Sequence, residues 1–193
     1  MKTKLELVNY YLQDDTLLCI DNTLVHYEPI KISECIGKDY YDNVVHLLWN
    51  LEEIPKDFKF PRALKRITLH ENFNSDVNLP KCIIHLEFGK NFNKEVDLSN
   101  LINLTNLSFG RDFNQEVDLS NLINLTNLEF GRNFNQEVDL SNLVNLIHLE
   151  FGYNFNKKID LSDLVNLTHL NWYCNQEVDV SNLVNLTHLN FGP

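Results

Sequence analysis

The chain has 193 residues, 44% of them hydrophobic, which is enough for one domain with a packed core. Its formal net charge of −11, from 16 Lys and Arg against 27 Asp and Glu, disfavours nucleic acid and anionic membranes as partners, because phosphate binding needs clustered basic residues. The chain has no apolar run of membrane-spanning length and no signal-peptide pattern at its start, so we expect a cytoplasmic protein.

Residues 1–60 do not repeat and predict a small N-terminal cap. Apolar residues within 5–12 have a helical period, and the β-rich runs 16–20 and 23–27 predict a hairpin. The segment 42–50 fits either a short helix or the first strand of a repeat array. A cap that covers the apolar end of the first repeat keeps an array soluble; an independent recruiting module is the alternative.

Residues 61–193 form a repeat array. The 21-residue stretch Leu125–Asn145, LTNLEFGRNFNQEVDLSNLVN, recurs on both sides at the same spacing. We count about six units with an Asn-bearing turn, two of them two residues shorter, and a terminal half-unit. A unit this short cannot bury its own apolar face and must stack on its neighbours, which predicts a solenoid.

Each unit is numbered here from the first Leu of its LxxLxF motif. Side chains at positions 4 and 6, such as Leu128 and Phe130, should point inward, and those at 3, 5 and 7 outward, in one continuous parallel sheet. Gly131 at position 7 should permit a turn that a side chain would obstruct. Too few residues remain for a long helix, so the convex side should be extended or 3₁₀, with Asp118 or Ser120 capping its turn. The expected class is an α/β or mainly-β repeat.

An asparagine follows the Phe of every turn. A buried turn leaves backbone groups unpaired, and an Asn side chain supplies both an acceptor and donors, so this column predicts a structural ladder. Its members are Asn74, Asn93, Asn114, Asn135, Asn156 and Asn175. A rival column two residues upstream contains an Asp and is lost in the shortened sixth unit; its members are Asn72, Asn91, Asp112, Asn133 and Asn154.

The motifs LxxLxFxxN and LSNLxNLTxL resemble the leucine-rich-repeat superfamily. The FNQEV and FNKEV turns, and LPKCIIHLEFGKNFN at Leu79–Asn93, resemble FNIP repeats, a short leucine-rich variety of social amoebae and of giant viruses of amoebae. The sequence departs from that pattern at Glu95, Glu116 and Glu137, where the name-giving Pro would stand. An F-box often precedes FNIP repeats, so the resemblance implies an adaptor of a cullin-type ubiquitin ligase as one alternative, and the host cytoplasm as the location if the protein is viral.

The outward strand positions are the expected binding surface, because solenoids commonly bind through them. The candidate residues are His85, Glu87, Glu129, His148, Glu150, Tyr153, His169, Tyr173 and His188. Histidines on adjacent strands could share a metal, but drift in an Asn/His-rich repeat explains the same pattern, so we expect no metal and no cofactor. No Gly-rich phosphate loop, GxSxG or HExxH is present, and we expect no enzyme.

The sequence therefore predicts a non-catalytic module that binds an unidentified protein through the exposed face of its sheet. A self-assembling structural protein is a further alternative to the adaptor. The final strand, Leu186–Phe191, has no cap after it, and its open edge predicts a homodimer through that end. The four scattered cysteines (Cys19, Cys35, Cys82 and Cys174) suggest free thiols in a reducing compartment rather than disulfides or a metal site.

Overall fold

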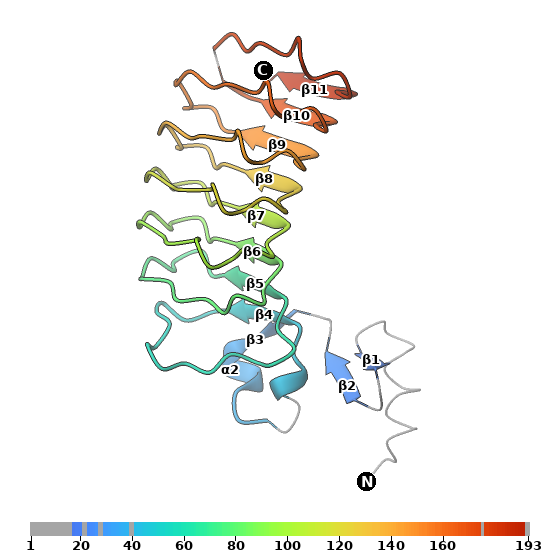
Figure 1. Cartoon of the computed structure of the whole chain (residues 1–193). Helices are drawn as coiled ribbons and strands as arrows, with labels where there is room; N and C mark the ends of the chain where they lie inside the picture. Colours follow the sequence, from blue (N-terminus) through green and yellow to red (C-terminus); the bar gives the residue numbers. More distant parts are fainter. Residues whose placement is uncertain (1–16, 21–22, 27–28, 39–40, 175, 192–193) are drawn as a thin grey trace.

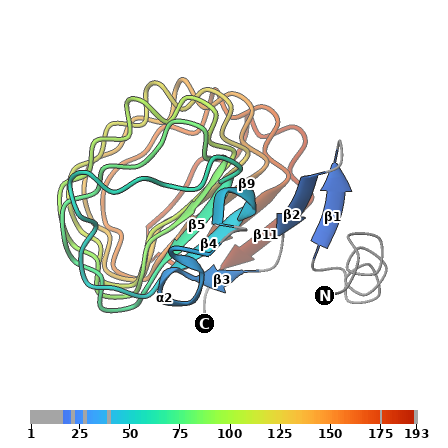
Figure 2. The same ribbon diagram turned by 90° about the horizontal axis from the view of Figure 1, so that it is seen from below.

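The computed structural model describes residues 17–20, 23–26, 29–38, 41–174 and 176–191. The predicted helix within residues 5–12 lies outside these residues. From residue 30 onward the chain winds into a solenoid with one strand per turn (Figure 1). Seen along its axis, the strands lie on one side and irregular segments close each turn on the other (Figure 2).

Nine strands form one parallel sheet in sequence order, as predicted. Equivalent positions of neighbouring units pair with one another; Leu128, for example, pairs with Leu107 on one side and Leu149 on the other. The fold is therefore a mainly-β leucine-rich-repeat solenoid. The strands are β3 (Ile30–Lys31), β4 (His46–Trp49), β5 (Arg66–Leu69), β6 (His85–Glu87), β7 (Asn106–Ser108), β8 (Asn127–Glu129), β9 (His148–Phe151), β10 (His169–Trp172) and β11 (His188–Phe191).

The N-terminal part contributes more to the sheet than its lack of repeats suggested. The predicted hairpin is present as β1 (Leu17–Ile20) and β2 (Thr23–His26), which pair antiparallel. The ambiguous segment 42–50 is a 3₁₀ turn, η1 (Tyr41–Asn43), followed by strand β4. Strands β3 and β4 both lie in the solenoid sheet, so the sheet begins upstream of residue 61. The short helix α2 (Ile32–Cys35) buries its first and last residues in the core.

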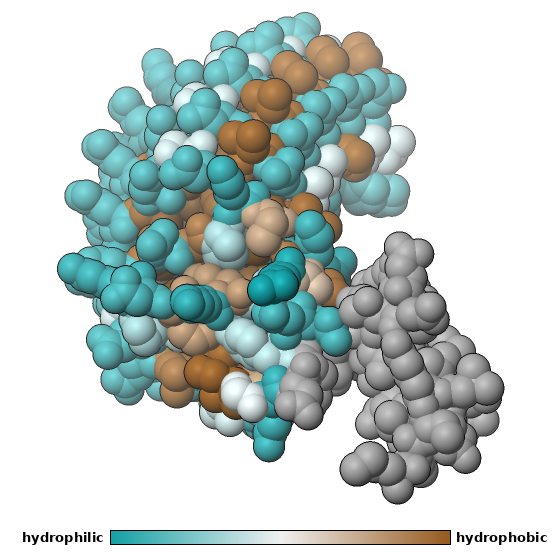
Figure 3. All heavy atoms as spheres, turned by 60° about the horizontal axis from the view of Figure 1, so that its bottom comes forward, coloured by the Kyte–Doolittle hydropathy of each residue, from teal (hydrophilic) through white to brown (hydrophobic). Residues whose placement is uncertain are grey.

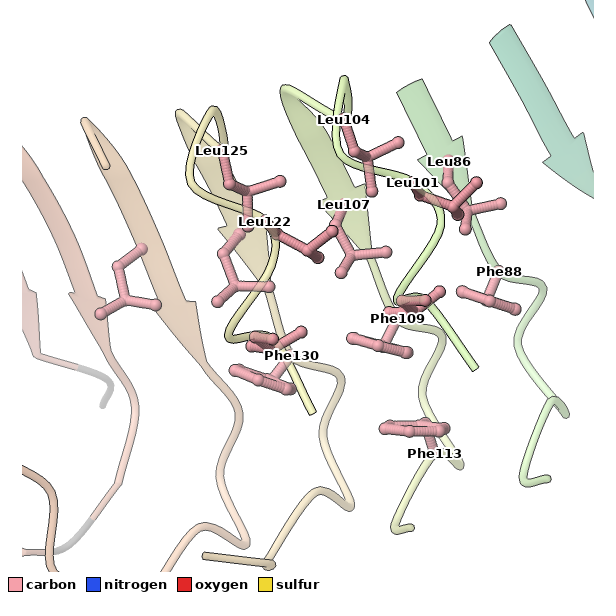
Figure 4. Packing of buried hydrophobic residues seen from close by; sticks show 14 of the residues in the cluster. Leu86, Phe88, Leu101, Leu104, Leu107, Phe109, Phe113, Leu122, Leu125 and Phe130 are labelled. Atoms are coloured by element: carbon pink, nitrogen blue, oxygen red, sulfur yellow. The ribbon is translucent and has the colours of Figure 1, made fainter. Parts of the chain in front are cut away.

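Two columns of aromatic rings fill the core along the solenoid axis (Figure 4). One column comes from position 6, where Phe109 and Phe130 stack with centroids 5.5 Å apart. The other comes from the turn, where Phe113 and Phe134 stack at 6.0 Å. Within one unit, Phe109 and Phe113 lie only 4.0 Å apart, so the two columns form a single stack. Leu columns at positions 1 and 4 pack beside these rings, which confirms the inward direction predicted for positions 4 and 6.

Tryptophan explains how the shortened sixth unit keeps a complete core. Trp172 stands at position 6 and packs edge-on against both Phe151 and Phe155 of the preceding unit. Its indole N–H donates to the carbonyl of Gln176 at 2.9 Å, which ties the shorter turn to the ring. Trp49 on β4, in the unit before the first Asn-bearing one, makes the same bond to the carbonyl of Glu53 at 3.1 Å. In the sixth unit, Trp172 and the buried Cys174 thus stand where a full-length unit has two phenyl rings.

The glycine column is required because the backbones of neighbouring units approach closely there. The sequence had suggested instead that each glycine permits the turn within its own unit. A Cβ on Gly131 would lie 2.0 Å from the carbonyl oxygen of Gly110, and one on Gly110 equally close to that of Gly89. Neither glycine has a positive φ; within the described residues the positive-φ glycine is Gly37, at φ 75°. The missing side chain therefore lets neighbouring turns touch through their backbones.

The predicted asparagine ladder is present through five described members. The Oδ1 atom of each Asn accepts a hydrogen bond from the backbone N–H of the next; the distance is 2.9 Å from Asn93 to Asn74 and 2.8 Å from Asn135 to Asn114. Asn175 lies outside the described residues. The predicted buried setting was wrong, because these side chains are exposed or half-buried.

The rival column is also hydrogen-bonded. The prediction that only one of the two Asn columns forms a ladder was therefore wrong. The amide of Asn133 donates to Asp112 Oδ1 at 2.9 Å, and the amide of Asn154 donates to Asn133 Oδ1 at 3.0 Å. A third column was not predicted at all. Its members donate to a backbone carbonyl of the preceding unit, as Asn145 does to Ile123 at 2.9 Å and Asn166 to Val144 at 2.9 Å.

The convex side consists of tight turns and extended segments, as expected from the short repeat. Leu122 N–H bonds to Leu119 O and Leu125 N–H to Leu122 O, both at 2.9 Å, which is 3₁₀-type bonding. Asp118 Oδ1 accepts the Ser120 N–H at 2.9 Å and so caps the turn. This bond, together with one from the Ser120 hydroxyl, lowers the pKa of Asp118, and the same arrangement recurs at Asp97, Asp139, Asp160 and Asp179.

Candidate interaction surface

The outward side chains of β4 to β11 form one polar face. Strict register places position 3 of each strand beside position 3 of the next, so His148, His169 and His188 are direct neighbours. Position 5 forms a second column, in which Glu129 lies beside Glu150 and Glu150 beside Asn171. The face therefore presents parallel columns, and within each column successive side chains come from strands about 4.8 Å apart.

The three histidines form a stacked column at the C-terminal end of the face. The rings of His169 and His188 lie 4.1 Å apart and nearly parallel, and those of His148 and His169 lie 6.1 Å apart. Thr168 Oγ1 is 2.8 Å from His169 Nδ1, which fixes the direction of that ring. Loss of hydration, and then the neighbouring His188 and His148, lower the pKa of His169. The column therefore favours neutral imidazole at its centre.

Carboxylates of the second column are held by neighbouring polar groups. Ser108 Oγ donates to Glu129 at 3.2 Å, and the Asn171 amide donates to Glu150 at 2.8 Å. His148 Nε2 lies 4.0 Å from the other oxygen of Glu129, so this pair becomes an ion pair when the histidine is protonated. Glu87, on β6, accepts a hydrogen bond from Thr68 Oγ1 at 3.2 Å. Glu87, Glu129 and Glu150 in this column therefore carry oriented acceptor oxygens.

An aromatic pair borders the C-terminal half of the face. Tyr153 and Tyr173 stack with centroids 5.3 Å apart, although Tyr153 is 45% exposed. Arg132 Cζ lies 5.7 Å from the centroid of the Tyr153 ring, and Asn190 Nδ2 lies 3.4 Å from the Tyr173 hydroxyl. Burial, and then Glu150 and Tyr153, raise the pKa of Tyr173. Large, fixed, exposed aromatic rings are typical of the residues that dominate protein interfaces.

The N-terminal half of the face contains a histidine that sequence reasoning missed. His46 on β4 lies beside Arg66 in register, and its Nε2 is 3.1 Å from Thr68 Oγ1. Burial, and then the charges of Arg66 and His85, lower the pKa of His46 to about 4. Its unit lacks the FN turn that marks the full-length units, so only Val44, Leu47 and Trp49 at the spacing of the LxxLxF motif could have revealed the position.

The nine predicted surface residues divide into two groups. Those on β8 to β10 and the turns that follow, together with His188, lie close together, as the contacts above show. His85 and Glu87 lie on β6, where burial and then Arg66 lower the pKa of His85. A shallow hollow of about 230 Å³ connects the groups; it is lined by His85, Glu87, Asn106, Ser108, Asn127 and Glu129, among others.

Neither a metal centre nor a membrane helix is found in the described part of the chain. Among its His, Cys, Asp and Glu side chains, no group of three or more is arranged to hold a metal ion. Its helices are all too short to cross a membrane. The face offers hydrogen-bonding, titratable and aromatic groups at fixed spacing, which is chemistry for recognition of a surface.

The chain resembles solved leucine-rich-repeat structures. It shares 34% identity with CroV588, described as a novel circular LRR protein, from the giant virus CroV; the likeness covers 78% of this chain and 24% of that one, with a TM-score of 0.66. An internalin, InlF, of Listeria monocytogenes shares the fold at 24% identity, covering 67% of this chain and 42% of that one, with a TM-score of 0.52. The chain thus spans less than half of either structure. No protein-family model matches it, and no curated protein does.

Proposed function

We propose that this leucine-rich-repeat solenoid is a protein-interaction module whose partner binds the exposed face of β6 to β11. The main support for the proposal is that inward and outward columns of side chains differ in how far their residues vary. Inward positions repeat from unit to unit, whereas outward positions differ and gather three histidines, two glutamates and a tyrosine pair at one end. A face that varies on a constant scaffold is what recognition of a particular partner requires.

A non-catalytic role suits this geometry better than catalysis. The candidate acid and base groups, such as Glu129 and His148, stand on an open face above a shallow hollow. Catalytic sites usually enclose their substrate and exclude water, which strengthens the electrostatic interactions within them. Binding through an open face needs no such enclosure.

The tyrosine pair should contribute most of the binding energy. Tyr153 and Tyr173 are held by stacking and by Arg132, so little side-chain entropy is lost when a partner covers them. The neighbouring histidine column adds hydrogen-bonding groups at fixed spacing. We therefore place the centre of the interface between β9 and β11.

Affinity capture from host-cell lysate, followed by mass spectrometry, tests the proposal. Three baits are compared: wild type, Tyr153→Ser/Tyr173→Ser, and Asn121→Ser, an exposed change outside the sheet face. The expected result is one protein retained by wild type and Asn121→Ser and lost with the double variant. A partner captured equally by all three would refute the proposed face.

The repeats and the structural neighbour support a narrower classification. We propose that the array is of the FNIP type, because the FNQEV turns form the ladder-bearing corners of the solenoid and the CroV neighbour comes from a giant virus. We also propose a cytoplasmic location, supported by Cys35, Cys82 and Cys174, which are free thiols. The ligase-adaptor alternative depends on residues 1–60 and stays a prediction; binding of that segment, within the whole chain, to a Skp-type protein would favour it.

Self-association through β11 is a second candidate, favoured by exposure of core positions. Leu189 and Phe191 are 38% and 59% exposed, whereas the equivalent Leu170 and Trp172 on β10 are 0% and 1% exposed. A second β11 could cover these side chains and pair with the open strand edge. Light scattering of wild type and Phe191→Asn at high concentration tests this; a wild-type monomer would rule it out.

A further inference from the structure

A row of exposed aliphatic side chains runs along the solenoid outside the sheet face. It consists of the fifth residue of each LSNLxNL motif and of its variants LSDLVNL and VSNLVNL, and its exposed fractions run from 44% at Val144 to 80% at Val184. Figure 3 shows hydrophobic side chains gathered in such a row along the array. We call it the lateral ridge; its members are Ile102, Ile123, Val144, Val165 and Val184.

The ridge keeps its character where other exposed positions do not. Position 8 changes from Lys90 to Arg111 and then to Tyr153 along the array. The ridge position is Ile or Val in five consecutive units, although none of the five belongs to the buried core. Four of the five are about half exposed to water, and Val184 is 80% exposed. Burial of this exposed apolar surface by a partner is favourable.

The ridge lies in a narrow uncharged band of a strongly acidic chain, directly after the column of turn-capping Asp residues that includes Asp118 and Asp139. Four of the five motif segments around it contain only Leu, Ser, Asn, Thr, Ile and Val; the fifth contains Asp163. With a net charge of −11, two copies repel each other over most of their surface. The repulsion between two copies is smallest where their uncharged bands face each other.

The ridge is also rigid and evenly spaced. The carbonyls of Ile123 and Val144 accept hydrogen bonds from Asn145 and Asn166 of the next unit, both at 2.9 Å. These bonds fix the ridge backbone at the repeat spacing of the sheet, about 4.8 Å. Two identical ridges therefore match each other along their whole length, roughly 19 Å for five units.

We propose that the lateral ridge is the contact between two copies of this chain, packed side by side with their axes antiparallel. A two-fold axis passes near Val144, the middle member, and each ridge side chain lies between two of the partner copy. The contact is modest in area, so the dimer is a weak one that forms at high protein concentration. It leaves the sheet face free, so this inference goes beyond the proposed partner binding.

Sedimentation velocity over a concentration series reaching about 1 mM tests the ridge. Wild type should dimerise, and Val144→Asp and Val144→Lys should each weaken the dimer by at least about tenfold, because like charges then meet near the two-fold axis. An equimolar mixture of the two variants should restore dimers. Leu51→Asp is the matched control, since Leu51 is also 44% exposed and lies outside the ridge.

Thermal unfolding of each variant separates lost association from lost folding, and all should melt within a few degrees of wild type. A wild-type monomer at every concentration would overturn the proposal. So would a dimer that Phe191→Asn abolishes and Val144→Asp leaves intact, which would identify β11 as the interface. Failure of the mixed variants to associate would exclude a two-fold axis near Val144. None of these results bears on capture of a partner by the sheet face.

Discussion

Replacing Gly131 by Ala should destabilise the solenoid strongly, and so should the same change at Gly89 or Gly110. The new Cβ would lie 2.0 Å from the carbonyl oxygen of Gly110. An ordinary contact is longer by more than about 1 Å, so the two turns must separate. That separation opens the stack between Phe109 and Phe130, now 5.5 Å apart, and forfeits part of its contact energy.

Overpacking of this kind costs typically 1–3 kcal/mol, and backbone atoms cannot move aside as a flexible side chain can, so we expect a loss of about 3 kcal/mol. With a urea m-value of about 2 kcal/mol/M, the unfolding midpoint should fall by about 1.5 M. Gly37→Ala is the control, since its φ is 75° with open space around the added Cβ, and it should cost only about 1 kcal/mol.

The two tryptophans allow the assay to be read at both ends of the array. Trp49 and Trp172 are each 1% exposed and lie on either side of the Gly131 turn. In backgrounds that retain one of them, urea unfolding followed by fluorescence should show whether the variant splits the array into halves that unfold separately. An unchanged midpoint in Gly131→Ala, or a larger loss in Gly37→Ala, would refute the close-approach argument.

Three further predictions concern the polar columns. Asn114→Ala should cost about 1–2 kcal/mol in urea unfolding, because it removes the acceptor of the Asn135 N–H, whereas Asn114→Asp should retain most of the stability. His46 has a pKa of about 4 in the folded chain against 6.5 in the unfolded chain, so the unfolded chain binds this proton at a higher pH. The free energy of unfolding should therefore fall as pH drops from 6.5 to 4, and it should fall by a smaller amount in His46→Gln. Asp118 and Asp139 have lowered pKa values in the folded state, so they stabilise the fold above about pH 4, and this stabilisation is lost as pH falls through their folded pKa values. In Asp118→Asn/Asp139→Asn, the urea concentration at the unfolding midpoint should therefore depend less on pH in that acid range.

The repeat made the fold predictable from the sequence. A fixed spacing of Leu128, Phe130 and Asn135 with their equivalents determines strand direction, pairing register and the inward face together, because only stacking can bury a unit so short. The repeat spacing did not predict that β3 and β4 belong to the sheet, because their units lack the Gly and the FN turn of the other units. Their place in the sheet depends on burial of Val44 and Leu47 beneath the first full unit, which is a tertiary effect.

The polar columns were harder to predict than the apolar ones. An Asn at a fixed repeat position can bond along its own turn, to the next side chain, or to the neighbouring backbone, and the sequence does not distinguish these. Asn135 Oδ1 accepts the backbone N–H of Asn156 in the ladder, the Asn133 amide donates to the side chain of Asp112, and the Asn145 amide donates to a carbonyl of the preceding unit. Alternation along the strands predicted which residues point outward, but the stacking of Tyr153 on Tyr173 depends on a two-residue deletion whose path only the structure shows.

The contacts between neighbouring units, here called joints, are nearly identical along the array, and this affects how the gene can change over generations. Phe134 lies 6.0 Å from Phe113 and 6.1 Å from Phe155, so removing Leu125–Asn145 would bring two already compatible surfaces together. Misaligned recombination between repeats in the gene yields products that differ by a whole 21-residue turn. Every such product inherits intact joints and a longer or shorter row of outward side chains. Length is therefore a heritable variable that selection can act on separately from the residues themselves.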